Sequence, residues 1–500
     1  MKKMYPLLFL AMLVVFGCSE EKIKQDQFDQ TEELEPLTTL EINGIINELL
    51  EKKGEFNWSD VDNFVLWSAL MHGDNILSIG FYNEPFTTEK SNEQIAVKKD
   101  LIGLVVDMES DYSEEIKTEE KLLVYDGREL NHMDMVVYSL ETLETLRNSP
   151  NIRYLEPSGY TYFAHEDVLK SASGCNTTPS YVYPADYTTI APGSLQSWTY
   201  SHHNIPQAWN YSTGTGITVG LIDTGISSEQ SLLGNNFNQG YSTGRFVQKY
   251  GTYVNSIWPW STTTDGPDDQ CGHGTLMAAT IASPRNSQNL PVGVAYNCNL
   301  VAYRGTSDVV LDGYHEKRGV SQALIELANR SDVKIISMSI GHIFSAGNIS
   351  DAIKYAYSKG KMIIAAGGTS TWFTNWAGVI FPASMDETIA VTGITDGAGY
   401  TECRVCHKGS KIDFTVVMQR ASDSDRTSAC LGYFENTSTY VGGSSVATAT
   451  TAGIAALIWS QNPTWNRQQV YDKMKQSATF YPNRNSSFGW GSINALAAVQ

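Results

Sequence analysis

Positive charge is scarce in this chain. Its 500 residues include 35 Lys and Arg against 54 Asp and Glu, which gives a formal net charge of −19. Such an acidic surface repels a phosphate backbone, so nucleic acid is excluded as a partner. The hydrophobic fraction of 42% is nevertheless sufficient for a sizeable core in two or three domains.

Long apolar runs are also missing. Beyond residue 16 no segment is long and apolar enough to cross a membrane as a helix, which excludes a helical membrane domain from that part of the sequence. The start of the chain is different, because Met1-Lys2-Lys3 is followed by the apolar residues 7–16 and by Gly17-Cys18. A charged start before a short apolar run is typical of an export signal.

The end of that apolar run indicates the kind of signal. Val15-Phe16-Gly17-Cys18 resembles a bacterial lipoprotein signal, in which the cysteine becomes the lipidated N-terminus. The resemblance implies a signal peptide over residues 1–17 and a protein anchored through Cys18 to the cell envelope, at the outer membrane or cell surface. An ordinary secretory signal with an incidental cysteine is the alternative. The polar residues 18–39 are predicted to form a flexible tether.

Cysteine is sparse, with seven residues in the chain. Without Cys18 an even number remains, which favours disulfides in an exported protein, although the sequence does not choose the pairs. Cys403 and Cys406 form a C-x-x-C beside His407, but no second pair of ligands has the spacing of a zinc site. We therefore expect no metal centre; a calcium ion could bind at a position that the sequence does not identify. The other cysteines are Cys175, Cys271, Cys298 and Cys430.

Residues 40–164 are expected to form a small α+β prodomain. The pattern predicts helix over most of residues 40–77. Strands are predicted at residues 75–81, 101–107 and 122–125, followed by a strand, a helix and another strand between Val136 and Pro157. The next segment, residues 165–200, is rich in Ser, Thr, Tyr, Pro and Gly and has little periodicity, so we expect a linker.

From residue 201 onward, short apolar runs lie between helical patterns. Several runs are rich in Val and Ile, as strands buried on both faces are, and they cover residues 217–222, 299–303, 333–340, 361–366, 388–393 and 412–417. Helical patterns cover residues 274–283, 320–329 and 349–359. This alternation predicts an α/β fold in which a parallel sheet is flanked by helices.

Three residues of this region have settings that suit nucleophilic catalysis. Asp223 follows an apolar run within I-D-T-G, at the strand end where sites form in parallel sheets. His273 stands between two glycines before a helical pattern, and Ser445 opens a helix rich in small residues. The N–H groups of a first helical turn are free to stabilise an oxyanion beside such a serine. Taken singly, the three could equally be a turn cap, a core histidine and an ordinary Gly-Ser turn.

The chain order Asp223, His273, Ser445, together with the motifs I-D-T-G, G-H-G-T and G-x-S-x-A, resembles the subtilase family of serine peptidases. The resemblance spans residues 201–500 and implies a subtilisin-like catalytic domain without an organic cofactor. Further segments that match lie at residues 337–341, 365–367, 381–392 and 489–495.

The resemblance also implies a role for each residue. Ser445 would attack the peptide carbonyl to form an acyl-enzyme, His273 would take the proton and return it, and Asp223 would orient His273. Ser444 is a rival nucleophile, although the register of the motif favours Ser445. The expected substrates are proteins or peptides. The residues whose backbone would line the substrate pocket and pair with an extended peptide are Ser339, Ile340, Gly341, Ala366 and Gly367.

A second resemblance concerns the segment before the linker. A helical pattern, then Ser149-Pro150 and the run Asn151–Pro157, resemble the end of a subtilisin-type propeptide, and the likeness begins near residue 95. It implies that this segment inhibits the enzyme until it is cut away, near residues 163–170.

One family residue is missing. The asparagine that normally follows Ala-Ala-Gly and donates its side-chain amide to the oxyanion is replaced by Gly368. Loss of such a donor lowers turnover by about 10²–10³. The Ser445 N–H remains, and Thr369, Ser370 or Asn375 could supply a second donor; if none does, Gly368→Asn should raise turnover. Two functions therefore stay open, an exported serine endopeptidase made as a proenzyme and a binding or scaffold protein of the same fold with weak or no activity.

An acidic segment precedes the histidine. Asp265, Asp268 and Asp269 lie on a segment that in this family borders the pocket next to the cleaved bond. If their carboxylates face the groove, a basic substrate residue near that bond is preferred. A solvated acidic turn, with or without calcium, is the alternative.

Overall fold

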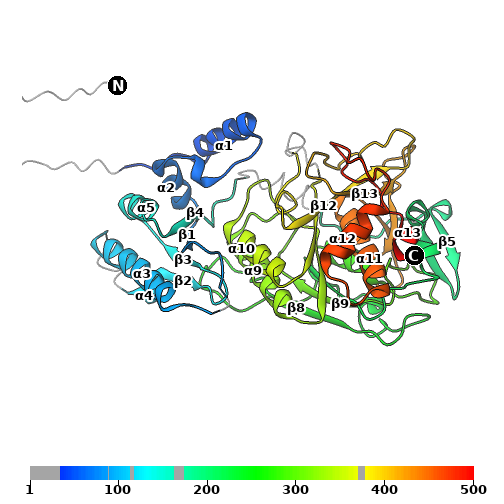
Figure 1. Ribbon diagram of the computed structural model, residues 1–500. Helices are drawn as coiled ribbons and strands as arrows, with labels where there is room; N and C mark the ends of the chain where they lie inside the picture. The colour runs from blue at the N-terminus through cyan, green and yellow to red at the C-terminus, as the bar shows by residue number, and fades with distance from the viewer. Residues whose placement is uncertain (1–33, 88, 113–117, 163–173, 370–377) are drawn as a thin grey trace, which may run out of the picture. The chain divides into compact units, whose positions relative to one another are not determined.

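The computed structural model describes residues 34–87, 89–112, 118–162, 174–369 and 378–500. The expected signal peptide, Cys18 and most of the tether therefore lie outside the described residues. The chain divides into two units, Met1–Glu35 and Pro36–Gln500, and the helices and strands of Figure 1 belong to the second. None of the described helices is long and apolar enough to cross a membrane.

A seven-stranded parallel sheet organises the carboxyl-terminal part of the chain, in the order β13-β12-β11-β10-β7-β9-β8. The predicted apolar runs coincide with six of these strands. The edge strand β8 was not predicted, because its sequence VQKYG is polar and only half buried. The strands are β7 (Thr218–Asp223), β8 (Val247–Gly251), β9 (Asn299–Arg304), β10 (Val333–Met338), β11 (Met362–Ala366), β12 (Thr388–Thr395) and β13 (Phe414–Gln419).

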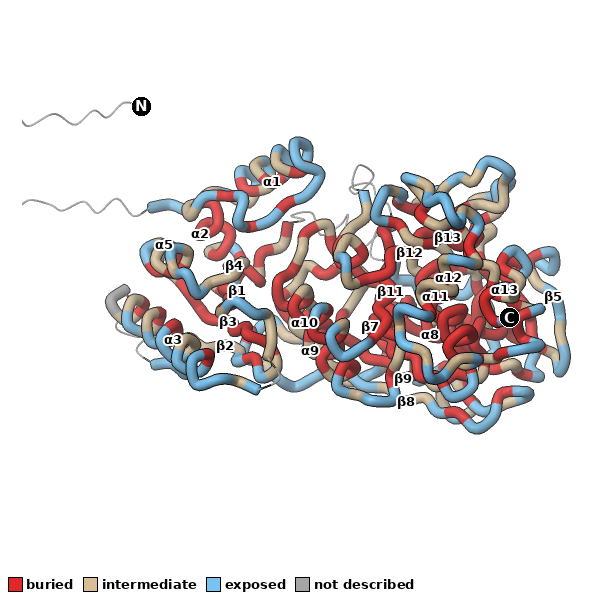
Figure 2. Tube along the Cα trace, in the orientation of Figure 1, coloured by how far each residue is buried: buried red, intermediate tan, exposed pale blue. Residues whose placement is uncertain are grey.

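Helices cover both faces of the sheet. The helices α8 (His273–Ala282) and α11 (Gly443–Gln461) share one hydrophobic core with the sheet, and α9 (Tyr314–Asn329) and α10 (Gly347–Ser358) share another. Successive strand residues alternate between these cores, as Ile335 and Ile336 do. Figure 2 shows β7, β9, β11 and α8 as buried segments. The predicted α/β fold, a parallel sheet flanked by helices, is confirmed.

Helix α11 is buried along almost its whole length. Small residues allow other chain segments to approach it closely; a Cβ at Gly453 would lie 2.6 Å from Cβ of Val294. The helix contacts β10, β11, β12 and β13 as well as α8. The first turn of α11 is therefore held rigidly at the edge of the sheet.

The amino-terminal module, residues 36–162, is a four-stranded antiparallel sheet with helices and its own core. The predicted strands at residues 75–81 and 122–125 are confirmed, as are the helix and the last strand before Pro157, whereas the strand expected from Val136 onward ends at that residue. Its elements are α1 (Thr39–Lys53), η1 (Trp58–Asp60), α2 (Asn63–Met71), β1 (Ile76–Phe81), α3 (Asn92–Tyr112), α4 (Glu119–Leu122), β2 (Leu123–Asp126), β3 (His132–Val136), α5 (Leu140–Arg147) and β4 (Ile152–Pro157).

The predicted strand at residues 101–107 is wrong, because these residues lie within helix α3. A short apolar run does not distinguish a strand from a buried helix. Burial reveals the helical period, since Leu101, Ile102, Val105 and Glu109 are buried while Gly103 is exposed. The carboxylate of Glu109 accepts hydrogen bonds from the N–H groups of Tyr138 and Ser139.

The segment expected to be a linker has regular structure in its described part. A hairpin of β5 (Tyr187–Ile190) and β6 (Ser194–Ser197) follows the turn η2 (Pro184–Asp186), and β6 is fully buried. The hairpin was not predicted, because its Ser and Thr residues do not form the apolar pattern of a strand. The remaining elements are η3 (Trp198–His203), α7 (Ile205–Ala208), η4 (Ser231–Leu233), β14 (Ser428–Leu431), β15 (Ser438–Val441), α12 (Arg467–Gln476) and α13 (Ala495–Val499).

Candidate active site

The predicted site residues come together at the carboxyl edge of the parallel sheet. Strand β7 ends at Asp223, helix α8 begins at His273, and Ser445 is the third residue of helix α11. His273 and Ser445 line a common cavity of about 290 Å³. Asp223 is buried behind His273, with 1% of its surface exposed.

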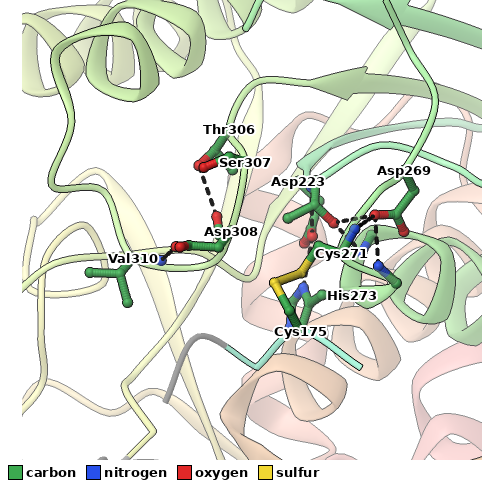
Figure 3. The surroundings of a disulfide bond; sticks show 12 residues. Cys175, Asp223, Asp269, Cys271, His273, Thr306, Ser307, Asp308 and Val310 are labelled. Atoms are coloured by element: carbon green, nitrogen blue, oxygen red, sulfur yellow. Dashed lines mark hydrogen bonds and ion pairs between the residues drawn. A yellow bond between two sulfur atoms is a disulfide. The ribbon is translucent and has the colours of Figure 1, made fainter. Parts of the chain in front are cut away.

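Asp223 and His273 form a buried pair. Nδ1 of His273 lies 2.7 Å from Oδ1 of Asp223, and the same oxygen accepts the N–H of Thr224 at 2.8 Å. Figure 3 shows the two side chains directed toward each other. With the carboxylate at Nδ1, the ring proton is held there, and Nε2 is left to accept a proton.

The surrounding carboxylates raise the pKa of His273. Burial alone works to lower the pKa of this imidazole, but the charge and hydrogen bond of Asp223 outweigh it, with smaller contributions from Asp269 and Asp308. The net result is a pKa above the ordinary value of 6.5. The protonated imidazolium is therefore stabilised, as a general base requires once it has taken a proton.

The two serines at the start of α11 have different surroundings. Ser444 is buried, and its Oγ lies 3.0 Å from Oγ1 of Thr369. Ser445 is partly exposed in the cavity; its Oγ donates to the carbonyl of Ser339 at 3.4 Å, and Ser339 Oγ donates to the Ser445 carbonyl at 3.0 Å. No hydrogen bond joins the described side chains of Ser445 and His273. Accessibility thus favours Ser445 over Ser444 as the nucleophile.

Gly368 has a backbone conformation that residues with a side chain rarely adopt. Its φ is +124°, and a Cβ at this position would lie 2.4 Å from Nδ1 of His407. An asparagine therefore does not fit here without displacement of His407, so the expected gain from Gly368→Asn has no structural basis. Thr369 lines the cavity next to Ser444. Ser370 and Asn375, the other donors considered, lie outside the described residues.

The expected peptide-binding edge is already paired within the chain. The N–H of Gly341 donates to the carbonyl of Val309 at 2.9 Å, and the N–H of Leu311 donates to the carbonyl of Gly341 at 3.1 Å. An incoming peptide must open these bonds before it can pair with Gly341. The cavity is lined by four of the five expected residues, Ser339, Ile340, Gly341 and Ala366. Gly367 is not among the lining residues, and the N–H of Gly367 donates to the carbonyl of Val391.

The acidic segment before His273 has structural partners and does not line the cavity. Asp265 pairs with Arg304 at 2.8 Å, and Asp268 accepts the N–H of Ser228. The condition for selecting a basic substrate residue, carboxylates that face the groove, is therefore not met by these side chains.

Asp269 is the site residue whose role the sequence did not reveal. Its Oδ1 accepts the N–H groups of Cys271 and Gly272 and the hydroxyl of Thr224, and its Oδ2 accepts both polar groups of Thr275. Asp269 thereby joins the turn after Asp223 to the loop before His273. No periodicity marks such a residue; its one signal is its position just before the G-H-G motif.

Two of the expected disulfides form, and two cysteines stay free. Cys175 pairs with Cys271, and Cys403 pairs with Cys406, which takes both sulfurs of the C-x-x-C away from zinc. Cys298 and Cys430 are buried thiols, and burial raises the pKa of each to about 12. Within the described ranges, no group of three or more His, Cys, Asp and Glu side chains is placed to hold a metal ion.

Known proteins resemble this chain over the same region. The family model described as "Subtilase family" matches residues 214–491. The M-protease of Shouchella clausii is 30% identical over 339 residues, which cover 67% of this chain and 77% of that protein. Subtilisin E of Bacillus subtilis is 30% identical over 362 residues, with coverage of 72% and 78%. A solved structure titled "Proteases from Pseudoalteromonas arctica" has 23% identity and a TM-score of 0.47, covering 60% of this chain and 96% of that one.

Proposed function

Because this chain belongs to the subtilase family and is a subtilisin-like serine endopeptidase, we propose that it cleaves peptide bonds with Ser445, His273 and Asp223. The observation that carries the proposal is the buried contact of 2.7 Å between His273 and Asp223 at a cavity that Ser445 also lines. The family match argues against the alternative of an inactive scaffold protein. It also fits a reaction that side chains perform without an organic cofactor.

In the first half of the proposed reaction, Ser445 Oγ adds to the peptide carbonyl while Nε2 of His273 takes its proton. Asp223 holds the imidazole and stabilises its positive charge. His273 then protonates the leaving amine, the C–N bond breaks, and Ser445 carries the acyl group. Water attacks the acyl-enzyme in the second half, and His273 again moves the proton, so that the carboxylic acid leaves and Ser445 is restored.

The developing oxyanion needs donors near Ser445. The N–H of Ser445 lies in the first turn of α11, where backbone N–H groups have no partner within the helix. The hydroxyl of Thr369 is a further donor for this position, since Thr369 lines the cavity and contacts Ser444. In this proposal the Ser445 N–H is the donor that remains, and the Thr369 hydroxyl takes the place of the missing amide of the family asparagine.

We further propose that the amino-terminal module inhibits the enzyme until it is removed. Polar contacts between the module and the peptidase support this: Arg153 pairs with Asp351 at 2.7 Å, and Glu156 accepts the N–H of Gly347 at the start of α10 at 2.8 Å. The hydroxyl of Tyr314 donates to Asp134 at 3.1 Å.

Apolar contacts of the module reach the region beside the cavity. Phe344 belongs to the module's hydrophobic core, and its ring lies 4.9 Å from that of Tyr162. His342 and Ile343, just before Phe344, line the active-site cavity. Tyr162 is followed by residues 163–170, where we expect the cut; these lie outside the described residues. A module fixed beside the cavity is well placed to exclude substrate.

Expression of the full chain as wild type and as Ser445→Ala tests both proposals. The wild type should hydrolyse casein and show a new N-terminus near residues 163–170, and the variant should do neither. Hydrolysis by the variant would contradict the assignment of Ser445. An identical cut in both proteins would show that another protease removes the module.

We propose that the protein is exported and anchored in the cell envelope through lipid on Cys18. The lipoprotein-like residues 1–18 and the two disulfides support this. In a bacterial host, the wild type should appear in the membrane fraction with a diacylglyceryl-modified Cys18. Cys18→Ser should be released or retained as an uncut precursor. A soluble wild type without lipid would leave an ordinary secretory signal as the explanation.

A further inference from the structure

A short segment, residues 174–183, crosses the candidate active site and is called the strap below. The disulfide between Cys175 and Cys271 fastens its start across a sequence separation of 96 residues. Cys271 precedes His273 by two positions in the sequence, and Figure 3 shows the disulfide beside His273. The strap is thus joined covalently to the loop that carries the candidate general base.

The strap also packs directly on that loop. Gly272 has a φ of +93°, and a Cβ there would lie 2.6 Å from the carbonyl oxygen of Asn176. Any side chain at this position would push the strap away. The glycine before His273 therefore permits close contact of two backbones, in addition to the disulfide.

The far end of the strap is hydrogen-bonded to other residues of the cavity wall. The N–H of Ser180 donates to Thr439 Oγ1 at 3.1 Å, and Ser180 Oγ accepts the N–H of Tyr440 at 2.9 Å. The N–H of Tyr183 donates to the hydroxyl of Tyr440 at 3.1 Å. Thr439 and Tyr440 line the cavity as well, so the strap is held both beside His273 and at this second part of the wall.

Residues of the strap form part of the cavity wall. Gly174, Asn176 and Thr178 line the same space as His273 and Ser445. A Cβ at Gly174 would lie 3.7 Å from Cδ2 of His273 and 3.4 Å from Cγ2 of Val309. The space between His273 and Val309 is therefore limited by the backbone of the strap.

The chemistry of the wall is neutral. The lining residues include Leu276, Val309, Val310, Ile340 and Ile380, and none of the described side chains that line the cavity is Asp, Glu, Lys or Arg. A charged substrate side chain would lose its hydration here, and the described lining offers no side chain of fixed opposite charge to pair with it, which is unfavourable. A large side chain would meet the strap.

We propose that the strap determines specificity: it restricts the subsite between His273 and Val309 to small, uncharged side chains of a peptide substrate. The inference rests on the proposed function, since the subsite matters only if Ser445 and His273 cleave peptides. The disulfide maintains the restriction, because it holds Gly174 beside the histidine. Opening the disulfide releases this end of the wall and admits larger apolar side chains.

Two forms of the processed enzyme test the proposal against untreated wild type. The first is Cys175→Ser/Cys271→Ser. The second is wild type treated with a mild phosphine reductant after folding, so that failure of the variant to fold does not prevent the test. Cys175 is exposed whereas Cys403 and Cys406 are buried, so mild reduction should open the first disulfide before the second. Mass spectrometry after alkylation identifies the opened pair.

The assay measures kcat/KM with peptides in which each position around the cut bond carries Ala, Leu, Phe, Lys or Glu in turn. At one position the untreated enzyme should prefer Ala. There, kcat/KM for Leu or Phe relative to Ala should rise about tenfold in both opened forms, because pockets discriminate between side-chain sizes on this scale. Lys and Glu should remain poor in all forms. An unchanged ratio with the disulfide shown to be open would overturn the proposal, as would a preference of untreated enzyme for Lys, Glu or Phe at every position.

Labelling with a small fluorophosphonate separates this proposal from the proposed function. If Ser445 is labelled and peptides are cut, an unchanged ratio refutes the role of the strap alone. If Ser445 is not labelled and no peptide is cut in any form, the proposed function fails, and the role of the strap with it.

Discussion

Gly368 lies directly against His407: a Cβ at residue 368 would be 2.4 Å from the imidazole Nδ1, and the N–H of His407 donates to the Gly368 carbonyl at 3.1 Å. His407 is fixed in turn, because its Nδ1 lies 2.9 Å from the carbonyl of Gly378. The family asparagine is therefore absent at a position where this chain has no space for a side chain.

We predict that Gly368→Asn lowers activity. The change forces an unfavourable φ, at about 1–3 kcal/mol, and displaces His407, so kcat/KM should fall at least about tenfold and Tm should fall with it. Gly378→Ala is the matched control, because a Cβ there meets none of the described residues within 4 Å. Steady-state kinetics and thermal unfolding of both variants provide the test. Higher turnover by Gly368→Asn would show that the loop adapts and that the amide was the missing group.

We predict that the hydroxyl of Thr369 contributes to turnover. Its Oγ1 lies 3.0 Å from Oγ of Ser444, beside the first turn of α11. If it stabilises the oxyanion, Thr369→Val should lower kcat by about 10²-fold with little change in KM, the pattern of an interaction made in the transition state. Thr369→Ser keeps the hydroxyl and should retain most of the activity. Normal turnover by Thr369→Val would assign the donor to another residue, with Ser370 and Asn375 as the next candidates.

We predict that activity rises with pH through a midpoint above 6.5. Only neutral His273 can accept the proton from Ser445. Burial lowers the pKa of His273, but Asp223, Asp269 and Asp308 outweigh burial and raise that pKa above its ordinary value of 6.5. Removing the charge of Asp308 lowers that pKa, so Asp308→Asn should shift the acid limb of kcat/KM to lower pH. Asp332→Asn, a surface carboxylate paired with Arg330, is the control. An unshifted limb in Asp308→Asn would contradict the electrostatic coupling.

We predict that Glu156 makes the uncleaved chain less stable as pH rises. Burial raises the pKa of Glu156 from 4.5 to about 7, against the opposing hydrogen bond from Gly347. A raised carboxyl pKa means that the folded form holds the proton more tightly. Its stabilising contribution is complete below pH 4.5 and is lost as pH rises through about 7.

The inactive Ser445→Ala chain, which keeps the module attached, allows this prediction to be measured. Between pH 4.5 and 7 its Tm should fall more than that of Ser445→Ala/Glu156→Gln, by about 2–4 °C, the shift expected for ~1 kcal/mol in a large domain. Glutamine still accepts the N–H of Gly347 but carries no charge. If Tm of the two chains falls equally with pH, Glu156 is excluded as the group responsible for the loss of stability.

The sequence predicted the sheet and singled out the three residues that we propose as the triad because local signals mark both. Six parallel strands are apolar on both faces, and Asp223, His273 and Ser445 each stand in a short glycine-containing motif. Strand β8 and helix α3 were missed or misassigned for a physical reason. An edge strand needs no apolar run, and an apolar run as short as residues 101–107 suits a helix and a strand equally.

The rest of the site depends on contacts between distant residues. The disulfide from Cys175 to Cys271, the pairing of Gly341 with Val309, and the hydrogen bonds of Asp269 to the turns beside Asp223 and His273 all join separate segments. A single sequence does not reveal such pairs, since many partners are compatible with each residue. For the same reason the acidic turn before His273 could be recognised, but the direction of its carboxylates could not.

The most direct test of the account is to identify the residue that a fluorophosphonate modifies. The processed enzyme is labelled, digested and analysed by mass spectrometry, with Ser444→Ala and Ser445→Ala treated in parallel. We predict one adduct, on Ser445, which is retained in Ser444→Ala and absent, together with peptide cleavage, in Ser445→Ala. An adduct on Ser444, or peptide cleavage that survives in Ser445→Ala, would contradict the assignment of Ser445 as the nucleophile.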